Sequence, residues 1–297
     1  MKRLDKSEII FKIIAYTFTI LFALMCLYPL VYAVSGTFSG TLALMQGKVI
    51  LWPVDFQVNA FVGVMKDKIF WLTYSNTLFL TFYGTIWSML VSILGAYALS
   101  KKRLLFRKQL NFLLVFTMWF TAGLVPTFKN YSASLNVFQS LGINDPKWLI
   151  VIAMGVGAYN IILIRNAFEA VPKEIEEAAI VDGANEFQIL TNVYIPMSKA
   201  SIATVALFYG VSRWNGYFWA KQFAIKENRP LQVYIQQKLT ETNEAINEGT
   251  FIVDLSQPHP DSTMYAMILC SIIPILLIYP YIQKYFARGV NLGGVKE

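Results

Sequence analysis

Long apolar segments alternate with short charged segments along most of the chain. A helix needs about 20 apolar residues to cross the roughly 30 Å hydrocarbon core of a bilayer. Six segments have this size, and the fifth is the weakest because it contains Arg213 and Asn215. They cover residues 9–34, 71–99, 110–128, 148–164, 200–220 and 263–285. The pattern predicts an all-α membrane protein with six transmembrane helices, in which Pro29, Pro126, Pro274 and Pro280 introduce kinks.

The first apolar segment follows the basic start MKRLDK, which also occurs in secretory signal peptides. The segment is longer than the apolar part of a typical signal peptide, and no clear small-x-small cleavage site follows it. We therefore expect a retained first span.

The positions of Lys and Arg predict the orientation of the spans. The short loop KKRLLFRK at 101–108 is strongly basic, which is typical of cytoplasmic loops. With six spans, both termini and the segment at 172–197 lie on the same side as this loop. The segments at 35–70, 129–147 and 221–262 then face outward. We expect cytoplasmic N- and C-termini.

Composition agrees with a membrane protein and excludes several classes of function. The chain is 56% hydrophobic and its mean hydropathy is +0.49. Its net charge of +7 arises from Lys and Arg that flank apolar segments, so no nucleic-acid partner is expected. Cys26, Cys270 and the single His259 indicate neither a metal site nor a catalytic set. No GxxxxGK[ST] motif occurs, so we predict neither an enzyme nor a bound cofactor, and any ATP is hydrolysed by a partner.

The polar segment VPKEIEEAAIVDGANEFQILTNVYIPM at 171–197 interrupts the apolar pattern. Pro172 suits the first turn of a helix, and good helix formers follow it. Gly183 is able to adopt the left-handed conformation that ends a helix. A second turn is expected at 186–192, and Pro196 is expected to end the unit. These residues predict a small helix-turn-helix knob, although composition alone also fits a solvated linker.

The spacing of Glu177, Ala178, Ala179 and Gly183 before the sequence VYIP resembles the EAA loop of the membrane subunits of ABC importers. The whole segment is similar to that of carbohydrate permeases of the maltose type. Other stretches are similar in the same order, including SNT at 75–77, GAYALSK at 95–101, LGIND at 141–145, RWNGYFW at 213–219 and QKYFARGV at 283–290.

The resemblance implies the type I ABC importer permease architecture in a bacterial cell membrane. It divides the chain into an N-terminal span and outer segment at 1–70, a permease core at 71–290 with a coupling loop at about 172–197, and a cytoplasmic tail at 291–297. It implies a second permease, two ATPase subunits that use ATP and Mg, an extracytoplasmic solute-binding protein and surrounding lipid. The residues implied to couple to the ATPase are Glu177, Ala178, Ala179, Asp182, Gly183 and Pro196.

Arg213 is a full charge within a predicted span, and two interpretations remain open. Its side chain reaches the outer interface if it snorkels. Alternatively, Arg213 lies on a substrate pathway with Trp214, Asn215, Tyr217 and Trp219, whose rings and amide suit a sugar. An arginine there binds carboxylate groups, which predicts an acidic oligosaccharide as substrate.

The alternative class is an ion-coupled secondary transporter. Such a protein is expected to carry Asp, Glu or His inside its spans as proton relays. The six predicted spans contain none of these residues. The sequence therefore favours the ABC importer.

Overall fold

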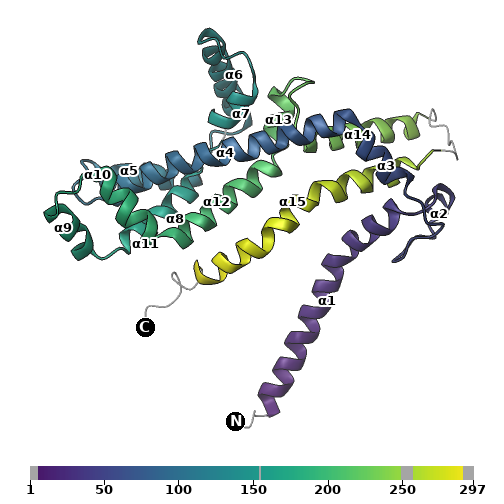
Figure 1. The fold of residues 1–297 in the computed structure, drawn as a ribbon, viewed down its shortest axis with the longest axis horizontal. Helices are drawn as coiled ribbons and strands as arrows, with labels where there is room; N and C mark the ends of the chain where they lie inside the picture. Colours follow the sequence, from purple (N-terminus) through teal and green to yellow (C-terminus); the bar gives the residue numbers. More distant parts are fainter. Residues whose placement is uncertain (1–5, 154, 249–256, 290–297) are drawn as a thin grey trace. The chain divides into compact units, whose positions relative to one another are not determined.

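The computed structural model describes residues 6–153, 155–248 and 257–289, and these residues form helices and loops without a strand. The chain begins with α1 (Lys6–Thr37), α2 (Thr41–Met45), α3 (Asn59–Lys66), α4 (Lys68–Ser100) and α5 (Arg107–Trp119). It continues with α6 (Leu124–Ser140), α7 (Lys147–Ala153), α8 (Ala158–Glu169), α9 (Lys173–Val181), α10 (Glu186–Ile189), the π-helical turn η1 (Leu190–Tyr194) and α11 (Ile195–Met197). The last helices are α12 (Lys199–Trp214), α13 (Phe218–Phe223), α14 (Leu231–Asn247) and α15 (Pro260–Gly289) (Figure 1).

Within the described residues, three helices are long and apolar enough to cross a membrane. They are α1, α4 and the part of α15 up to Pro280. The number rises to five if two bent pairs each form one span, namely α5 with α6, bent by 116°, and α7 with α8, bent by 46°. The prediction of an all-helical membrane protein is therefore confirmed, and the six-span count is supported only in part. The predicted fifth span corresponds to α12, which has 16 residues, and to α13 after a short break.

The predicted span at 110–128 is not a single straight helix. The helical backbone stops after Trp119 and resumes at Leu124, and Gly123 between them has a φ of 81°. Pro126 lies in the first turn of α6, where a proline needs no hydrogen-bond donor. The expected kink at Pro126 is therefore a complete break just before it.

The described chain divides into two compact units. The first comprises residues 1–71 and 234–273, and the second comprises 72–233 and 274–297, of which the predicted tail at 291–297 lies outside the described residues. In the first unit, the hydroxyl of Tyr234 donates to the carboxylate of Asp67 at 2.6 Å, and Thr41 donates to the carbonyl of Gln257 at 3.0 Å. These bonds connect α14 with the end of α3, and α2 with the segment before α15.

The second unit contains the segment with the predicted coupling residues. Its core is built from buried side chains of α4, α8, η1 and α12, among them Ile164, Phe168, Tyr194 and Val205. Figure 1 shows α9, α10 and α11 together at one end of this unit, where α4 also ends. The core therefore supports the polar segment from one side and leaves its other side exposed.

Candidate functional site

Helix α9 ends in a turn that only a few residues permit. Gly183 has a φ of 79°, its N–H donates to the carbonyl of Ile180 at 3.0 Å, and the N–H of Ala184 donates to the carbonyl of Ala179 at 3.0 Å. This pair of bonds is the Schellman motif, which satisfies the last carbonyls of a helix and needs a left-handed residue. The turn predicted at Gly183 is confirmed.

A capping box starts the second helix of the segment. The side chain of Asn185 accepts from the N–H of Gln188 at 2.9 Å, and the side chain of Gln188 accepts from the N–H of Asn185 at 2.8 Å. Each side chain satisfies an amide that the helix leaves unpaired. Together with Gly183, the box fixes the direction of the chain between α9 and α10.

Pro196 does not end this unit as the sequence predicted. It lies inside α11, and the helical path from α10 continues through it until the distorted residue Ser198. A proline lacks an N–H and clashes with the carbonyl four residues earlier. The wider π-helical turn η1 directly before it accommodates this clash, so the segment leads into α12 with little interruption.

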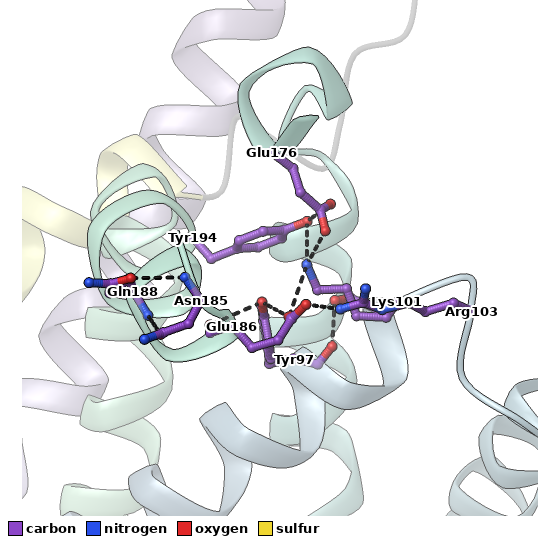
Figure 2. A network of polar contacts seen from close by, with 9 residues as sticks. Tyr97, Lys101, Arg103, Glu176, Asn185, Glu186, Gln188 and Tyr194 are labelled. Carbon is purple, nitrogen blue, oxygen red and sulfur yellow. Dashed lines mark hydrogen bonds and ion pairs between the residues drawn. The ribbon is translucent and has the colours of Figure 1, made fainter. Parts of the chain in front are cut away.

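A network of polar side chains ties the segment to the C-terminal end of α4 (Figure 2). The ammonium group of Lys101 pairs with the carboxylate of Glu176 and lies 4.4 Å from the ring centroids of both Tyr97 and Tyr194. The hydroxyl of Tyr194 donates to the other oxygen of Glu176 at 2.6 Å. Two tyrosine rings that pack edge-to-face with each other, and one carboxylate, thus contact a lysine that is only 9% exposed.

A second carboxylate extends the network to α10. Glu186 accepts from the hydroxyl of Tyr97 at 2.6 Å and forms an ion pair with Arg103. Its carboxylate also lies 4.0 Å from the ammonium group of Lys101. Both helices of the segment are therefore held to the same end of α4, α9 through Glu176 and α10 through Glu186.

The surroundings of Glu176 favour its ionised form. Partial burial raises the pKa of Glu176, but its hydrogen bonds with Lys101 and Tyr194 and the charges of Lys101 and Arg103 outweigh burial and lower it below its usual value. Burial, followed by the hydrogen bond to Glu176, raises the pKa of Tyr194, so its hydroxyl stays protonated and donates. Glu176 therefore acts inside the protein, as the charged partner of Lys101.

The basic loop at 101–108 lies beside the polar segment. Besides the pairs of Lys101 and Arg103, Arg107 pairs with Glu169 at the end of α8. Contact with the side chain and charge of Lys173 lowers the pKa of Lys102. The loop and the segment 172–197 therefore share one end of the second unit.

The outward side of the segment carries exposed apolar groups among its charges. Val181 is 86% exposed, Phe187 70% and Ile180 48%. Of the predicted coupling residues, Glu177, Ala178, Asp182, Gly183 and Pro196 are exposed, whereas Ala179 packs against the core. We call Glu177, Ile180, Val181, Asp182 and Phe187 the α9–α10 surface. Exposed large apolar side chains on such short helices are typical of a contact surface for another protein.

The contacts of Arg213 argue against the snorkelling alternative, and its place on a substrate pathway stays a prediction. Its guanidinium donates to the carbonyl oxygens of Ile150 and Val151 at the C-terminal end of α7, and to the hydroxyl of Ser88. It points into the second unit, so it does not snorkel.

The remaining pathway residues divide into two groups. The ring of Trp214 packs edge-on against Tyr74, with centroids 5.7 Å apart, and lines an apolar cavity of about 510 Å³. Trp219 packs against Tyr131 with centroids 5.0 Å apart, and Lys221 lies over the half-buried ring of Tyr217. Asn215 is exposed. Trp219, Tyr217 and Asn215 thus remain accessible, whereas Trp214 faces apolar groups.

Sequence reasoning missed Tyr97, Lys101 and Tyr194 as partners of the polar segment. The first two lie in the stretch GAYALSK, which was singled out only for its similarity. Lys101 and Glu176 are 75 residues apart, so no local pattern pairs them.

The chain matches a known family along almost its whole length. Residues 5–292 match the family model described as "Binding-protein-dependent transport system inner membrane component". The polygalacturonan/rhamnogalacturonan transport system permease protein YtcP of Bacillus subtilis is 34% identical over 288 residues, covering 97% of this chain and 98% of YtcP. The maltodextrin transport system permease protein MdxG of the same organism is 27% identical over 292 residues, covering 96% of each chain.

One solved structure is similar along its whole length. It is a chain of a bacterial ABC transporter involved in the import of the acidic polysaccharide alginate, with 40% sequence identity and a TM-score of 0.84. The match covers 96% of this chain and 100% of that one.

Proposed function

Because the chain belongs to the family of binding-protein-dependent transport system inner membrane components, we propose that it is the permease subunit of an ABC importer for acidic oligosaccharides. It is a multi-pass protein of the inner membrane and is not itself catalytic. Membership of the family decides against the ion-coupled secondary transporter.

The observation that carries the acidic substrate is the chemistry shared by two similar proteins. YtcP is named for polygalacturonan and rhamnogalacturonan, and the similar solved transporter is described with alginate. These polymers contain uronic acids, whose carboxylates are ionised at neutral pH. An acidic substrate therefore no longer depends on Arg213. Asn215, Tyr217 and Trp219 stay our candidates for the pathway because they are accessible and suit a sugar ring.

The α9–α10 surface is proposed to bind one of two ATPase subunits, which supply ATP and Mg. Glu177, Ala178, Asp182 and Gly183 belong to this coupling loop. Ala179 supports it through its packing against the core, and Pro196 lies in the helical turn that leads into α12. We further propose a second permease, an extracytoplasmic binding protein and the surrounding lipid as partners.

The proposed topology has six spans with both termini in the cytoplasm. In this arrangement each bent pair and the pair α12 with α13 form one span. The shared position of the basic loop 101–108 and the segment 172–197 supports it, because an even number of spans must separate them. The division into residues 1–70, a permease core at 71–290 and a tail at 291–297 remains our working proposal.

The substrate is tested with the complete transporter, reconstituted in lipid with its partner subunits and binding protein. Oligogalacturonides and oligoalginates are compared with maltodextrins of equal length as stimulators of ATPase activity. We expect the acidic sugars to stimulate and the neutral ones to fail. Stimulation by maltodextrins alone would contradict the acidic substrate and leave the permease assignment intact.

A further inference from the structure

The helical hydrogen-bond pattern is interrupted between α7 and α8, the two helices of the second bent pair. α7 ends at Ala153 and α8 begins at Ala158, and the two axes differ by 46°. The last carbonyls of the first helix then lack intrahelical donors, and the first amides of the second helix lack intrahelical acceptors. Within a bilayer, such groups must be satisfied by the protein itself.

Side chains of α4 and α12 satisfy the carbonyl side of this break. Arg213 donates to the carbonyl of Ile150 and, at 2.9 Å, to that of Val151. The indole N–H of Trp87 donates to the carbonyl of Ile152 at 3.1 Å. Three consecutive carbonyls are thereby paired, and the positive charge of Arg213 lies at a helix C-terminus, where the helix dipole favours it.

One amide on the other side of the break is paired through the same two helices. The N–H of Gly157 donates to the hydroxyl of Tyr209 at 3.1 Å, and that hydroxyl shares a 2.6 Å hydrogen bond with Ser92. Tyr209 and Arg213 are four residues apart, so they lie on one face of α12. This face therefore contacts both sides of the break.

Two glycines leave the space that the guanidinium occupies. A Cβ at Gly84 would lie 2.8 Å from Nε and 3.0 Å from Cζ of Arg213. A Cβ at Gly155, in the break itself, would lie 2.6 Å from Cζ of Arg213 and 2.6 Å from the hydroxyl of Ser88. Neither position has room for alanine unless the arginine moves.

We propose that Arg213 is a positioning residue that ties α12 to the broken span, and that it does not bind the sugar. α12 begins at Lys199, directly after the segment 172–197, so it connects the proposed ATPase-binding surface to the break. When the ATPase moves this segment, α12 moves with it and carries the guanidinium of Arg213. The hydrogen bonds from Arg213 to the last carbonyls of α7 then change. This inference rests on the proposed coupling role of the α9–α10 surface.

The test separates positioning from ligand binding in the complete reconstituted transporter. The variants are Arg213→Gln, Arg213→Lys and Gly155→Ala, with Lys226→Gln as control because it removes an exposed cation of the same unit. Assembly, thermal midpoint, and the KM and kcat of oligosaccharide-stimulated ATPase activity are measured for each. The oligosaccharide used is whichever one stimulates the wild-type transporter. If acidic sugars fail to stimulate the wild type, that result contradicts the proposed substrate and leaves the role of Arg213 to be tested with the stimulating sugar.

We expect Arg213→Gln and Gly155→Ala to lower kcat at least about tenfold while KM stays within about twofold, since misplaced helices slow the coupled step without touching the sugar. Arg213→Lys, whose single ammonium pairs fewer carbonyls, should fall between them and the wild type, and Lys226→Gln should match the wild type. A tenfold rise in KM with unchanged kcat would show that Arg213 is a sugar ligand. A lower thermal midpoint with unchanged kcat per assembled complex would show a role in stability alone. Arg213→Lys supplies the same comparison if Arg213→Gln does not assemble.

Discussion

Lys101 is a charged residue that the fold removes almost completely from water, with an exposed fraction of 9%. The loss of hydration of an ammonium group is costly unless other groups replace the water. Glu176 supplies the opposite charge, and the ring faces of Tyr97 and Tyr194 supply the remaining contacts. The position of α9 relative to α4 therefore depends on a few electrostatic contacts.

Removing the charge of Lys101 should destabilise this end of the protein. Lys101→Met leaves Glu176 without its partner and is expected to cost about 3 kcal/mol, the usual penalty for breaking a half-buried pair from one side. The double variant Lys101→Met with Glu176→Gln should cost clearly less than the sum of the single variants, because no unpaired charge remains. Thermal unfolding of the purified complex measures all three. Additive losses would mean that the two residues do not act as a pair.

The same pair predicts a dependence on pH. Because the pKa of Glu176 is lower in the folded protein than its ordinary value of 4.5, its contribution is fully present at neutral pH. The contribution is lost as the pH falls below about 4.5 and through the lowered pKa. In the Glu176→Gln variant, the loss of stability that comes from protonating Glu176 at acidic pH should be absent.

Local residue patterns predicted the turn in this site but not its support. Gly183 and the sequence around it contain all the information needed for the Schellman turn, since the bonds join residues within five positions. The Lys101–Glu176 pair joins residues 75 positions apart, and the carboxylate looks like any other solvated Glu of a helix. The contacts of Arg213 were not predictable for the same reason, because its acceptors are backbone carbonyls that become available only where a distant helix breaks.

At the scale of elements, α9 combines a charged sequence with exposed apolar residues, and this combination makes its function testable. Val181→Asp and Glu177→Lys should each reduce recovery of the ATPase with the purified permease, because both residues belong to the exposed α9–α10 surface. Glu174→Lys, which changes an exposed charge in the first turn of the same helix, should have a smaller effect and serves as the matched control. If all three variants recover as much ATPase as the wild type, the segment is a solvated linker and the proposed contact is wrong.

Helix breaks explain why the predicted spans differ from the observed helices. Hydropathy reports how readily a segment enters a membrane and is insensitive to backbone continuity. The residues at 110–128 and 148–164 are apolar enough to cross a membrane. The helix nevertheless ends at Trp119 in the first segment and at Ala153 in the second. Gly123 and Gly155 lie in these breaks, and no local pattern distinguishes them from glycines tolerated inside helices. The positions of α1, α4 and α15, by contrast, follow directly from their long apolar runs.

At the scale of the whole molecule, topology depends on whether α12 and α13 cross the membrane. α12 has 16 residues, which at 1.5 Å per residue extend over about 24 Å, less than the roughly 30 Å of a bilayer core. The helix therefore needs α13 to complete a span. If it does, residues before α12 and after α13 lie on opposite sides of the membrane.

Single cysteines test this arrangement in a variant whose natural Cys26 and Cys270 are replaced by serine. Lys102, Asp182 and Lys226 are exposed, and each is changed to cysteine in turn. With six spans, a membrane-impermeant maleimide should label Lys102→Cys and Asp182→Cys only after the cytoplasmic side is opened, and Lys226→Cys in intact cells. The first two should behave alike whatever α12 does, because ion pairs hold their segments together at one end of the second unit. Labelling of Lys226→Cys only from the cytoplasmic side would mean that α12 and α13 enter the membrane without crossing it, and the six-span arrangement would then be wrong.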